Sequence, residues 1–183
     1  MGRVLAYSST PLNELTAHAA AFADPACVAV LDLSTADSKV MPTAFAVGTT
    51  LGFRARVRPV RRTGKTRDGG GGKERDAYDE SAETGAGRSA CYIEWAAQQL
   101  QAGGARLDSA QLDAFTMTRL LTRDRSGERS RRDAPLGPDA TVKGSLTVTD
   151  TAAFGTFLQR GIGRFRAFGF GMLLLSPSGP PRD

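Results

Sequence analysis

A glycine-rich segment near the end of the chain has the residue types and spacing that bind phosphate. Its four glycines and three arginines are Arg160, Gly161, Gly163, Arg164, Arg166, Gly169 and Gly171. Glycine has no Cβ, so backbone N–H groups beside it can approach an anion closely, and a guanidinium can donate two parallel hydrogen bonds to a phosphate. The pattern predicts a loop that binds a phosphate backbone; the alternative is a tight connection between a helix and a strand. We expect Phe165, Phe168 and Phe170 to pack in the core rather than to stack on bases.

Positive charge is concentrated in two further segments. Residues 54–75 contain nine Lys or Arg against two acids, and residues 119–132 contain six Arg against two acids. Such clusters are expected where a protein meets a nucleic-acid backbone, although either run alone is equally compatible with a solvated loop. The candidate nucleic-acid-binding residues outside the glycine-rich segment are Arg54, Arg56, Arg58, Arg61, Arg62, Arg119, Arg123, Arg125, Arg129, Arg131, Arg132 and Lys143.

Residues for acid–base, nucleophilic or metal chemistry are scarce. His18 is the only histidine, and its place in a predicted helix favours a packing or surface role. Cys27 and Cys91 fit neither a zinc spacing nor a disulfide framework, and the sequence has no Walker loop and no nucleophile elbow. We therefore predict no metal site and no small-molecule cofactor, and the sequence identifies no catalytic residue.

Composition indicates one ordinary domain or two small ones in a reducing compartment. The chain has 183 residues, 24 Lys and Arg against 19 Asp and Glu, and a net charge of +5. This excess is modest, so the local clustering is more informative than the total. Two cysteines without a framework are typical of a reducing compartment, and no apolar run reaches the length of a membrane span or resembles a signal peptide. We expect a cytoplasmic protein with no membrane partner.

Local patterns predict the elements that position these residues. Apolar residues alternate with arginines over residues 53–58, which predicts a strand with one core face and one cationic face. Residues 63–76 are glycine-rich and charged, and they predict a mobile loop. Apolar residues at helical spacing predict a helix within residues 87–104, with Ser89 as its cap and Gly103 at its end.

The second half of the chain predicts a hairpin, a helix and a strand. Residues 110–124 and 140–150 predict the two strands of a long β-hairpin whose connecting turn is arginine-rich. Asp150 is the predicted N-cap of a short helix that ends at Gly161. Residues 171–177 then predict an interior strand, because they are almost entirely apolar.

The order of these elements predicts an α+β fold. From Leu51 onward the order is strand, helix, strand, strand, helix, strand, which is the ferredoxin-like (RRM-like) βαββαβ pattern. The first 50 residues predict a strand at residues 2–9, a helix with Thr10 as its N-cap and a strand at residues 26–33, which is half of the same unit. We expect tandem ferredoxin-like domains, the first one incomplete. The predicted divisions are a partial domain over residues 1–50, a ferredoxin-like domain with the basic hairpin and the glycine-rich loop over residues 51–177, and a disordered tail over residues 178–183.

The segment "GIGRFRAFGFG" (161–171), between a short helix and a last apolar strand, resembles the glycine-rich loop of the CRISPR-associated RNA-processing endoribonucleases. Further stretches in the same order resemble the CasE-type branch, which works with the Cascade complex. These stretches are "VMPTAFAVGTTLGFRARVRPVRR", "ERDAYDE", "KGSLTVTD" and "GMLLLSP". The resemblance covers most of the chain from Met41 to Pro177.

The resemblance implies a function and partners. Family members have two tandem ferredoxin-like domains, bind the repeat stem-loop of a precursor CRISPR RNA, cut it at the 3′ base of the stem without metal and often stay bound to the product. We therefore expect a CRISPR RNA repeat hairpin and other Cascade-type effector subunits as partners. In CasE-type members the usual catalytic Tyr and His lie on the first helix of the first domain, and that part has no counterpart before Gly2.

Whether this chain is an enzyme therefore stays open at the sequence level. The catalytic role is not transferred to His18, which lies on the predicted second helix of that domain. The hypothesis is an RNA-binding subunit with weak or no self-contained nuclease activity. The alternatives are cleavage by a different residue set, a non-catalytic scaffold subunit of a ribonucleoprotein, and a ferredoxin-like ribosomal or regulatory RNA-binding protein.

Overall fold

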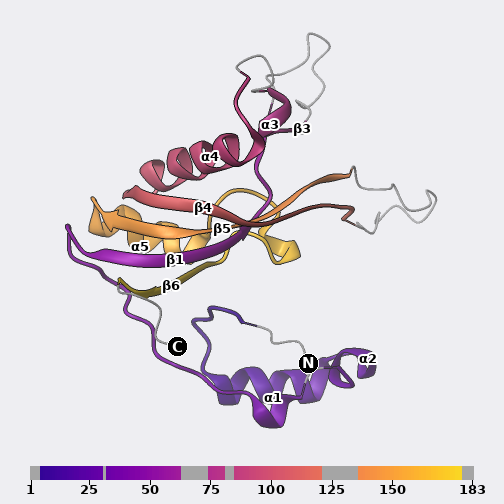
Figure 1. Cartoon of the computed structure of the whole chain (residues 1–183). Helices are drawn as coiled ribbons and strands as arrows, with labels where there is room; N and C mark the ends of the chain where they lie inside the picture. The colour runs from indigo at the N-terminus through magenta and orange to yellow at the C-terminus, as the bar shows by residue number, and fades with distance from the viewer. Residues whose placement is uncertain (1–4, 31, 63–73, 81–84, 121–135, 179–183) are drawn as a thin grey trace, which may run out of the picture. The chain divides into compact units, whose positions relative to one another are not determined.

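The computed structural model describes residues 5–30, 32–62, 74–80, 85–120 and 136–178. The chain divides into two units, Met1–Thr43 and Ala44–Asp183, each of which is described by itself (Figure 1). No helix within these described residues is long and apolar enough to cross a membrane.

The first unit consists of short helices. They are α1 (Leu12–Phe22), α2 (Pro25–Val28) and a 3-10 turn (Leu33–Thr35). The predicted first helix is confirmed, although Pro11 rather than Thr10 stands at its N-cap position. The predicted strand at residues 26–33 is wrong, because the Asp24 carboxylate accepts a hydrogen bond from Ala26 N at 2.8 Å and starts α2 instead.

The other predicted strand of this unit is also wrong for its described part, since residues 5–9 are irregular. No residue of α1, α2 or the 3-10 turn is buried. The assignment of residues 1–50 to part of a ferredoxin-like domain stays a prediction.

The second unit contains a four-stranded antiparallel sheet with the strand order β4-β5-β1-β6. Its strands are β1 (Thr50–Val57), β4 (Ala105–Thr118), β5 (Gly137–Val148) and β6 (Leu173–Pro177), and its main helices are α4 (Arg88–Ala102) and α5 (Thr151–Arg160). A separate short pair, β2 (Val60–Arg62) and β3 (Glu74–Asp76), precedes α3 (Ala77–Glu80). The α+β ferredoxin-like order is therefore confirmed. The last strand, predicted as interior, lies at an edge, because β1 is the one strand among the described residues that pairs with β6.

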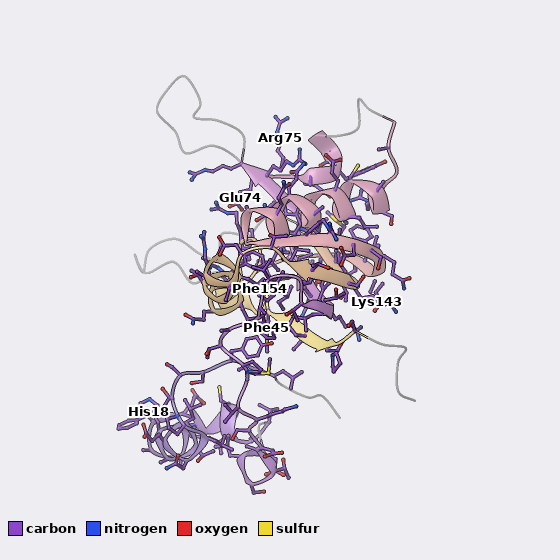
Figure 2. All side chains as sticks on the ribbon, turned by 90° about the vertical axis from the view of Figure 1, so that its left-hand side faces the viewer. His18, Phe45, Glu74, Arg75, Lys143 and Phe154 are labelled. Carbon is purple, nitrogen blue, oxygen red and sulfur yellow. The ribbon has the colours of Figure 1, made fainter. Side chains whose placement is uncertain are left out.

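The core lies on one face of this sheet. Phe53, Ala55 and Val57 of β1 are at most 4% exposed and join the apolar faces of α4 and α5 in one cluster. The α4 residues of this cluster include Tyr92, Trp95, Ala96 and Leu100. Phe45, just before the sheet, packs edge-on against Phe154 of α5 with ring centroids 5.6 Å apart (Figure 2). The opposite face of the sheet carries charged side chains that include Arg54, Asp113 and Lys143.

Helix boundaries follow local capping chemistry. Gly103 ends α4 as predicted, but α4 begins at Arg88 with Gly87 at the N-cap position, so Ser89 lies inside the helix and does not cap it. The Asp150 carboxylate accepts a hydrogen bond from Ala153 N at 2.9 Å, and Gly161 ends α5 with φ of 79°. Both boundaries predicted for α5 are thus confirmed.

Replacing the cap residue tests this assignment. Asp150→Ala leaves the first-turn N–H groups of α5 without a side-chain acceptor, so the free energy of unfolding should fall by about 1 kcal/mol. Asp150→Asn, which can still accept this bond, is the matched control and should lose much less. Urea denaturation measures both, and an alanine variant as stable as the parent would contradict the capping role.

Candidate nucleic-acid interface

The loop between α5 and β6 closes on its own backbone. Ile162 N donates to Gly171 O at 2.7 Å, and Gly161 N donates to Phe157 O at 2.7 Å. A Cβ on Gly161 would lie 2.7 Å from Gly171 O, and one on Gly171 would overlap Ile162 O. Both residues also have positive φ, so glycine is required twice at the neck of the loop.

The other two loop glycines have different surroundings. A Cβ on Gly163 would lie 2.7 Å from Trp95 Cη2, whereas a Cβ on Gly169 would meet nothing within 4 Å. The tight-connection interpretation therefore explains Gly161, Gly163 and Gly171. Only Gly169 has open space beside it for a ligand. A direct role of these four glycines in RNA binding stays a prediction.

The loop is attached to the end of β1 through Arg56. Gly171 N donates to Arg56 O at 2.7 Å, and the Arg56 guanidinium lies over the Phe170 ring, 4.9 Å from its centroid. The same guanidinium forms a bidentate ion pair with Asp139 of β5, with Nε–Oδ1 and Nη2–Oδ2 distances of 2.8 and 2.5 Å. The hydrogen bond to Asp139 raises the pKa of Arg56. The Asp139 side chain is only 6% exposed, whereas the Arg56 side chain is 57% exposed, so the carboxylate is buried and the guanidinium still meets solvent.

Two more loop arginines have fixed partners. Arg164 Nε lies 2.6 Å from Glu74 Oε1, which ties the loop to β3. Arg166 Nη1 donates to Arg160 O at 2.7 Å, at the carboxyl end of α5, where a cation is favoured by the helix dipole. Neither Arg160 nor Arg166 has an acidic partner among the described residues, and both are exposed.

The loop phenylalanines behave differently from one another. Phe170 is 3% exposed and packs as expected, but Phe168 is 40% exposed, so the core prediction is wrong for it. Phe165 is partly buried, and the Arg58 guanidinium lies over its ring, 5.1 Å from the centroid. It is the only non-glycine residue with positive φ (62°) in the described part of the chain.

A second cationic group lies on the uncovered face of the sheet. Asp113 of β4 forms ion pairs with Lys143 of β5 at 2.5 Å and with Arg54 of β1 at 3.0 Å. The hydrogen bond from Lys143 and the charge of Arg54 lower the pKa of Asp113. Both predicted cations are thus on this face, although each shares one carboxylate.

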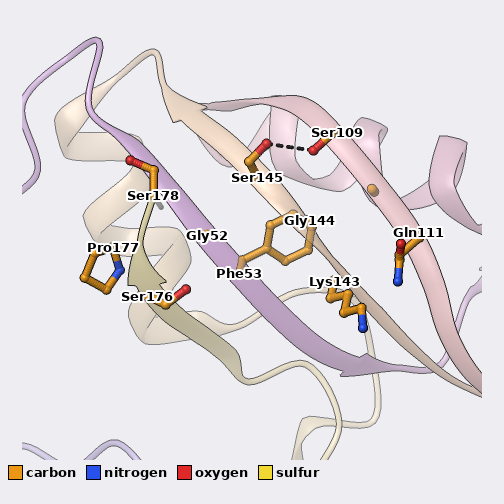
Figure 3. A pocket seen from close by; sticks show the side chains of 11 residues that line it. Gly52, Phe53, Ser109, Gln111, Lys143, Gly144, Ser145, Ser176, Pro177 and Ser178 are labelled. Atoms are coloured by element: carbon orange, nitrogen blue, oxygen red, sulfur yellow. Dashed lines mark hydrogen bonds between the residues drawn. The ribbon is translucent and has the colours of Figure 1, made fainter. Parts of the chain in front are cut away.

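A shallow hollow of about 470 Å³ lies beside this group (Figure 3). The strand registers align Ser109, Ser145, Gly52 and Ser176 in a row across the four strands. Ser109 and Ser145 are joined by a hydrogen bond of 2.8 Å between their hydroxyl groups. Lys143 and Gln111 border the same hollow together with Phe53 and Pro177, so its lining mixes serine hydroxyls, one cation and apolar side chains.

The remaining candidate cations lie in several places. The prediction that Arg58 belongs to the exposed cationic face is wrong, because β1 ends at Val57 and Arg58 is 4% exposed. Arg61 Nη2 donates to Gln98 Oε1 on α4 at 3.2 Å. Arg62 and Arg119 are exposed at the ends of β2 and β4. The predicted hairpin-turn residues Arg123, Arg125, Arg129, Arg131 and Arg132 lie outside the described residues.

Sequence reasoning missed the acids that organise these cations. Asp139, Glu74 and Asp113 each pair with a predicted RNA-binding residue. Arg56 and Asp139 are 83 positions apart in the sequence. Their proximity follows only from the register between β1 and β5, in which Arg56 lies opposite Thr141. No local pattern in the sequence marks these partners.

Groups suited to proton transfer are few in this unit. The described residues contain no set of three His, Cys, Asp or Glu that could hold a metal ion. His18 lies on α1 of the first unit, with its ring 4.9 Å from that of Phe22. Burial raises the pKa of Tyr92, whose hydroxyl donates to Asp76 Oδ2 at 2.9 Å. Tyr92 therefore stays protonated inside the core, away from solvent.

Comparison with known proteins identifies the family. A family model described as "CRISPR associated protein" matches residues 3–177. This chain belongs to the CRISPR-associated protein family. The relationship predicted from the glycine-rich segment is thereby confirmed.

Solved structures of CRISPR-associated proteins have the same fold. Cse3 of Thermus thermophilus, bound to an RNA representing a pre-cleavage complex, is 25% identical with a TM-score of 0.56; the match covers 76% of this chain and 59% of that one. The CRISPR endoribonuclease Cse3 bound to a 19 nt RNA is 25% identical with a TM-score of 0.58, and coverage is 80% of this chain and 68% of that one. The chain thus spans about three fifths to two thirds of these relatives. No curated protein matches.

Two alanine substitutions in this CRISPR-associated protein distinguish the crowded glycine Gly171 from Gly169, which has open space beside it. Gly169→Ala introduces only the strain of a positive φ, about 1–2 kcal/mol. Gly171→Ala adds an overlap with Ile162 O, so its loss should reach roughly 3 kcal/mol or more. Chemical denaturation compares the two variants, and equal losses would show that the neck of the loop is not closed as described.

Proposed function

We propose that this protein binds the repeat stem-loop of a CRISPR RNA, processes the precursor or holds the 3′ hairpin of the mature RNA, and anchors it in a Cascade-type effector complex. One observation carries the proposal. The glycine loop is hydrogen-bonded to the cationic end of β1, so Arg56, Arg164 and Arg166 belong to one connected group of residues. The structures with similar folds include Cse3 bound to RNA.

The paired strands β4 and β5 supply the second part of the proposed interface. The two strands pair from Ala105 and Val148 at one end to Thr118 and Gly137 at the other. The Thr118–Gly137 end, where the turn of the β-hairpin begins, lies at the same end of the sheet as the glycine loop. Arg119 is exposed where β4 ends, and the predicted turn arginines follow it in the sequence. An A-form stem is recognised mainly through its shape and backbone. A cationic hairpin beside a cationic loop suits such a stem.

Between cutting and holding RNA, we favour holding. Metal-free cleavage through the ribose 2′-hydroxyl needs one group to accept that proton and another to protonate the leaving oxygen. The unit that carries the proposed interface contains no histidine, because the only one is His18 in the first unit. Both cysteines are free, which suits the reducing cytoplasm that we propose as its location.

Binding to a repeat hairpin tests the proposal. The wild-type chain should bind it more tightly than a scrambled hairpin. Arg166→Ala should weaken binding about tenfold and lower the slope of log affinity against log salt by about one, because one phosphate contact is lost.

Arg106→Ala is the matched control for this experiment. Arg106 is an exposed arginine of β4 paired with Asp108, at the end of the sheet opposite to the loop, and its removal should change affinity little. Equal affinity for repeat and scrambled hairpins would favour the scaffold alternative. An Arg166→Ala variant that binds like the control would remove the loop from the interface.

Cleavage is tested separately from binding. Purified protein, incubated with end-labelled repeat RNA and no other protein, should leave the RNA intact or cut it only slowly, for want of a suitably placed acid and base. Gel analysis with a chelator present covers the metal-free reaction. Efficient cutting by the isolated chain would refute weak or absent nuclease activity of its own, and the His18→Ala variant would then show whether this histidine takes part.

A further inference from the structure

Arg58 stands between the two elements of the proposed interface. We propose that Arg58 is a positioning residue that holds the glycine loop in a fixed relation to the β4–β5 hairpin, and that it does not itself contact RNA. This inference rests on the proposed function, because it concerns how the protein presents two cationic elements to one RNA stem. It also replaces the direct phosphate contact predicted for Arg58.

The contacts of Arg58 reach both strands of the hairpin. Its Nη1 and Nη2 lie 3.4 and 3.3 Å from the carbonyl oxygen of Thr118, the last residue of β4. Its guanidinium also fills the space beside Gly137, the first residue of β5, where any Cβ would overlap Nη2. The side chain is therefore packed at the point where the hairpin leaves the sheet.

The same guanidinium reaches the glycine loop. Its Cζ lies 5.1 Å from the centroid of the Phe165 ring, within the range of a cation–π contact. With only 4% of Arg58 exposed, these contacts leave little of it accessible to a phosphate. One side chain thus bridges the loop and the root of the hairpin.

Charges around Arg58 offset part of the effect of its burial. Burial lowers the pKa of Arg58, while the charges of Asp139 and Glu74 raise it. These carboxylates are the ion-pair partners of Arg56 and Arg164. A guanidinium stays protonated in proteins, so three cations share two acids at this end of the sheet. Arg58 thus keeps its positive charge at this buried position, where an apolar side chain would contribute packing alone.

Backbone strain at Phe165 points to the same contact. Its φ of 62° and ψ of 28° place it in the left-handed region, which is costly for a bulky residue and favours glycine. Strain of this kind persists where surrounding contacts determine the conformation. The aromatic ring is what Arg58 contacts, so the cation–π contact offers a physical reason for a phenylalanine in a glycine-rich loop.

The consequence is preorganisation. The glycine loop joins the sheet through β6, and the β-hairpin is made of β4 and β5. In the strand order these two attachments lie on opposite sides of β1. An RNA stem that contacts both elements binds more tightly when their separation is already correct, since less ordering accompanies binding. Losing the Arg58 bridge should weaken binding of the RNA hairpin without removing any protein–phosphate ion pair.

Four variants test this role: Arg58→Lys, Arg58→Met, Phe165→Leu, and Arg58→Met combined with Phe165→Leu. Lysine keeps the charge but lacks the planar guanidinium. Each single variant should weaken binding of the repeat hairpin about tenfold. The double variant should bind like Arg58→Met, because both changes break one contact. The salt dependence of affinity should stay as in the wild type. Arg106→Met, at an exposed arginine at the opposite end of the sheet, is the control and should bind normally.

Several results would overturn the proposal. A salt slope lower by about one in Arg58→Met would show that Arg58 contacts a phosphate directly. Additive losses in the double variant would show that Arg58 and Phe165 act separately. Unchanged affinity in every single variant, or wild-type affinity in Arg58→Lys, would also refute it.

Hydrogen exchange without RNA keeps the inference apart from the proposed function. In Arg58→Lys and Phe165→Leu, exchange should accelerate together in the loop (161–170) and at the hairpin root (Thr118 and Gly137), with α4 unchanged. Acceleration across the whole unit would mean that Arg58 serves general stability alone and would overturn the proposal. A wild-type chain that fails to prefer the repeat hairpin refutes the proposed function, whereas this exchange pattern is measured independently of any RNA.

Discussion

The arrangement at the end of the sheet depends on the interactions of one arginine. Arg56 accepts a backbone hydrogen bond from Gly171, lies over Phe170 and forms a bidentate ion pair with Asp139. These contacts fix the glycine loop to β1 and β1 to the start of β5. Asp139 is nearly buried and accepts two hydrogen bonds from Arg56, so replacing Arg56 would remove the donors that satisfy this carboxylate. The ion pair is therefore a structural requirement as well as a source of positive charge.

Ion pairing also limits what the basic composition indicates about RNA binding. The net charge of +5 describes the whole chain, but Arg54, Lys143, Arg56 and Arg164 each have an acidic partner. A paired cation attracts a phosphate less than a free one, while its orientation is better defined. On the proposed function, shape and placement would thus contribute more to hairpin recognition than total charge. Arg160 and Arg166 differ from the paired cations, since neither has an acidic partner among the residues described.

Local features of the fold could be predicted from the sequence, and long-range ones could not. The alternation over residues 53–58, the Asp150 cap and the stop at Gly161 are set by neighbours within a few positions, and the structure confirms them up to Val57. The burial of Arg58 escapes such reasoning, because it depends on Gly137 and Phe165 meeting it in space. For the same reason the ion-pair partners and the edge position of β6 were not predictable, whereas the glycine pattern was specific enough to indicate the family.

Cross-linking tests most directly whether the loop and the hairpin form one RNA-binding surface. A repeat hairpin carrying photoreactive uridines in its stem would be irradiated in complex with the full chain, and the attached peptides would be identified by mass spectrometry. Cross-links from the same stem should fall both in residues 160–171 and in the segment that connects β4 to β5. Cross-links confined to α1, or to the exposed side of α4 with none in the loop, would contradict a shared surface.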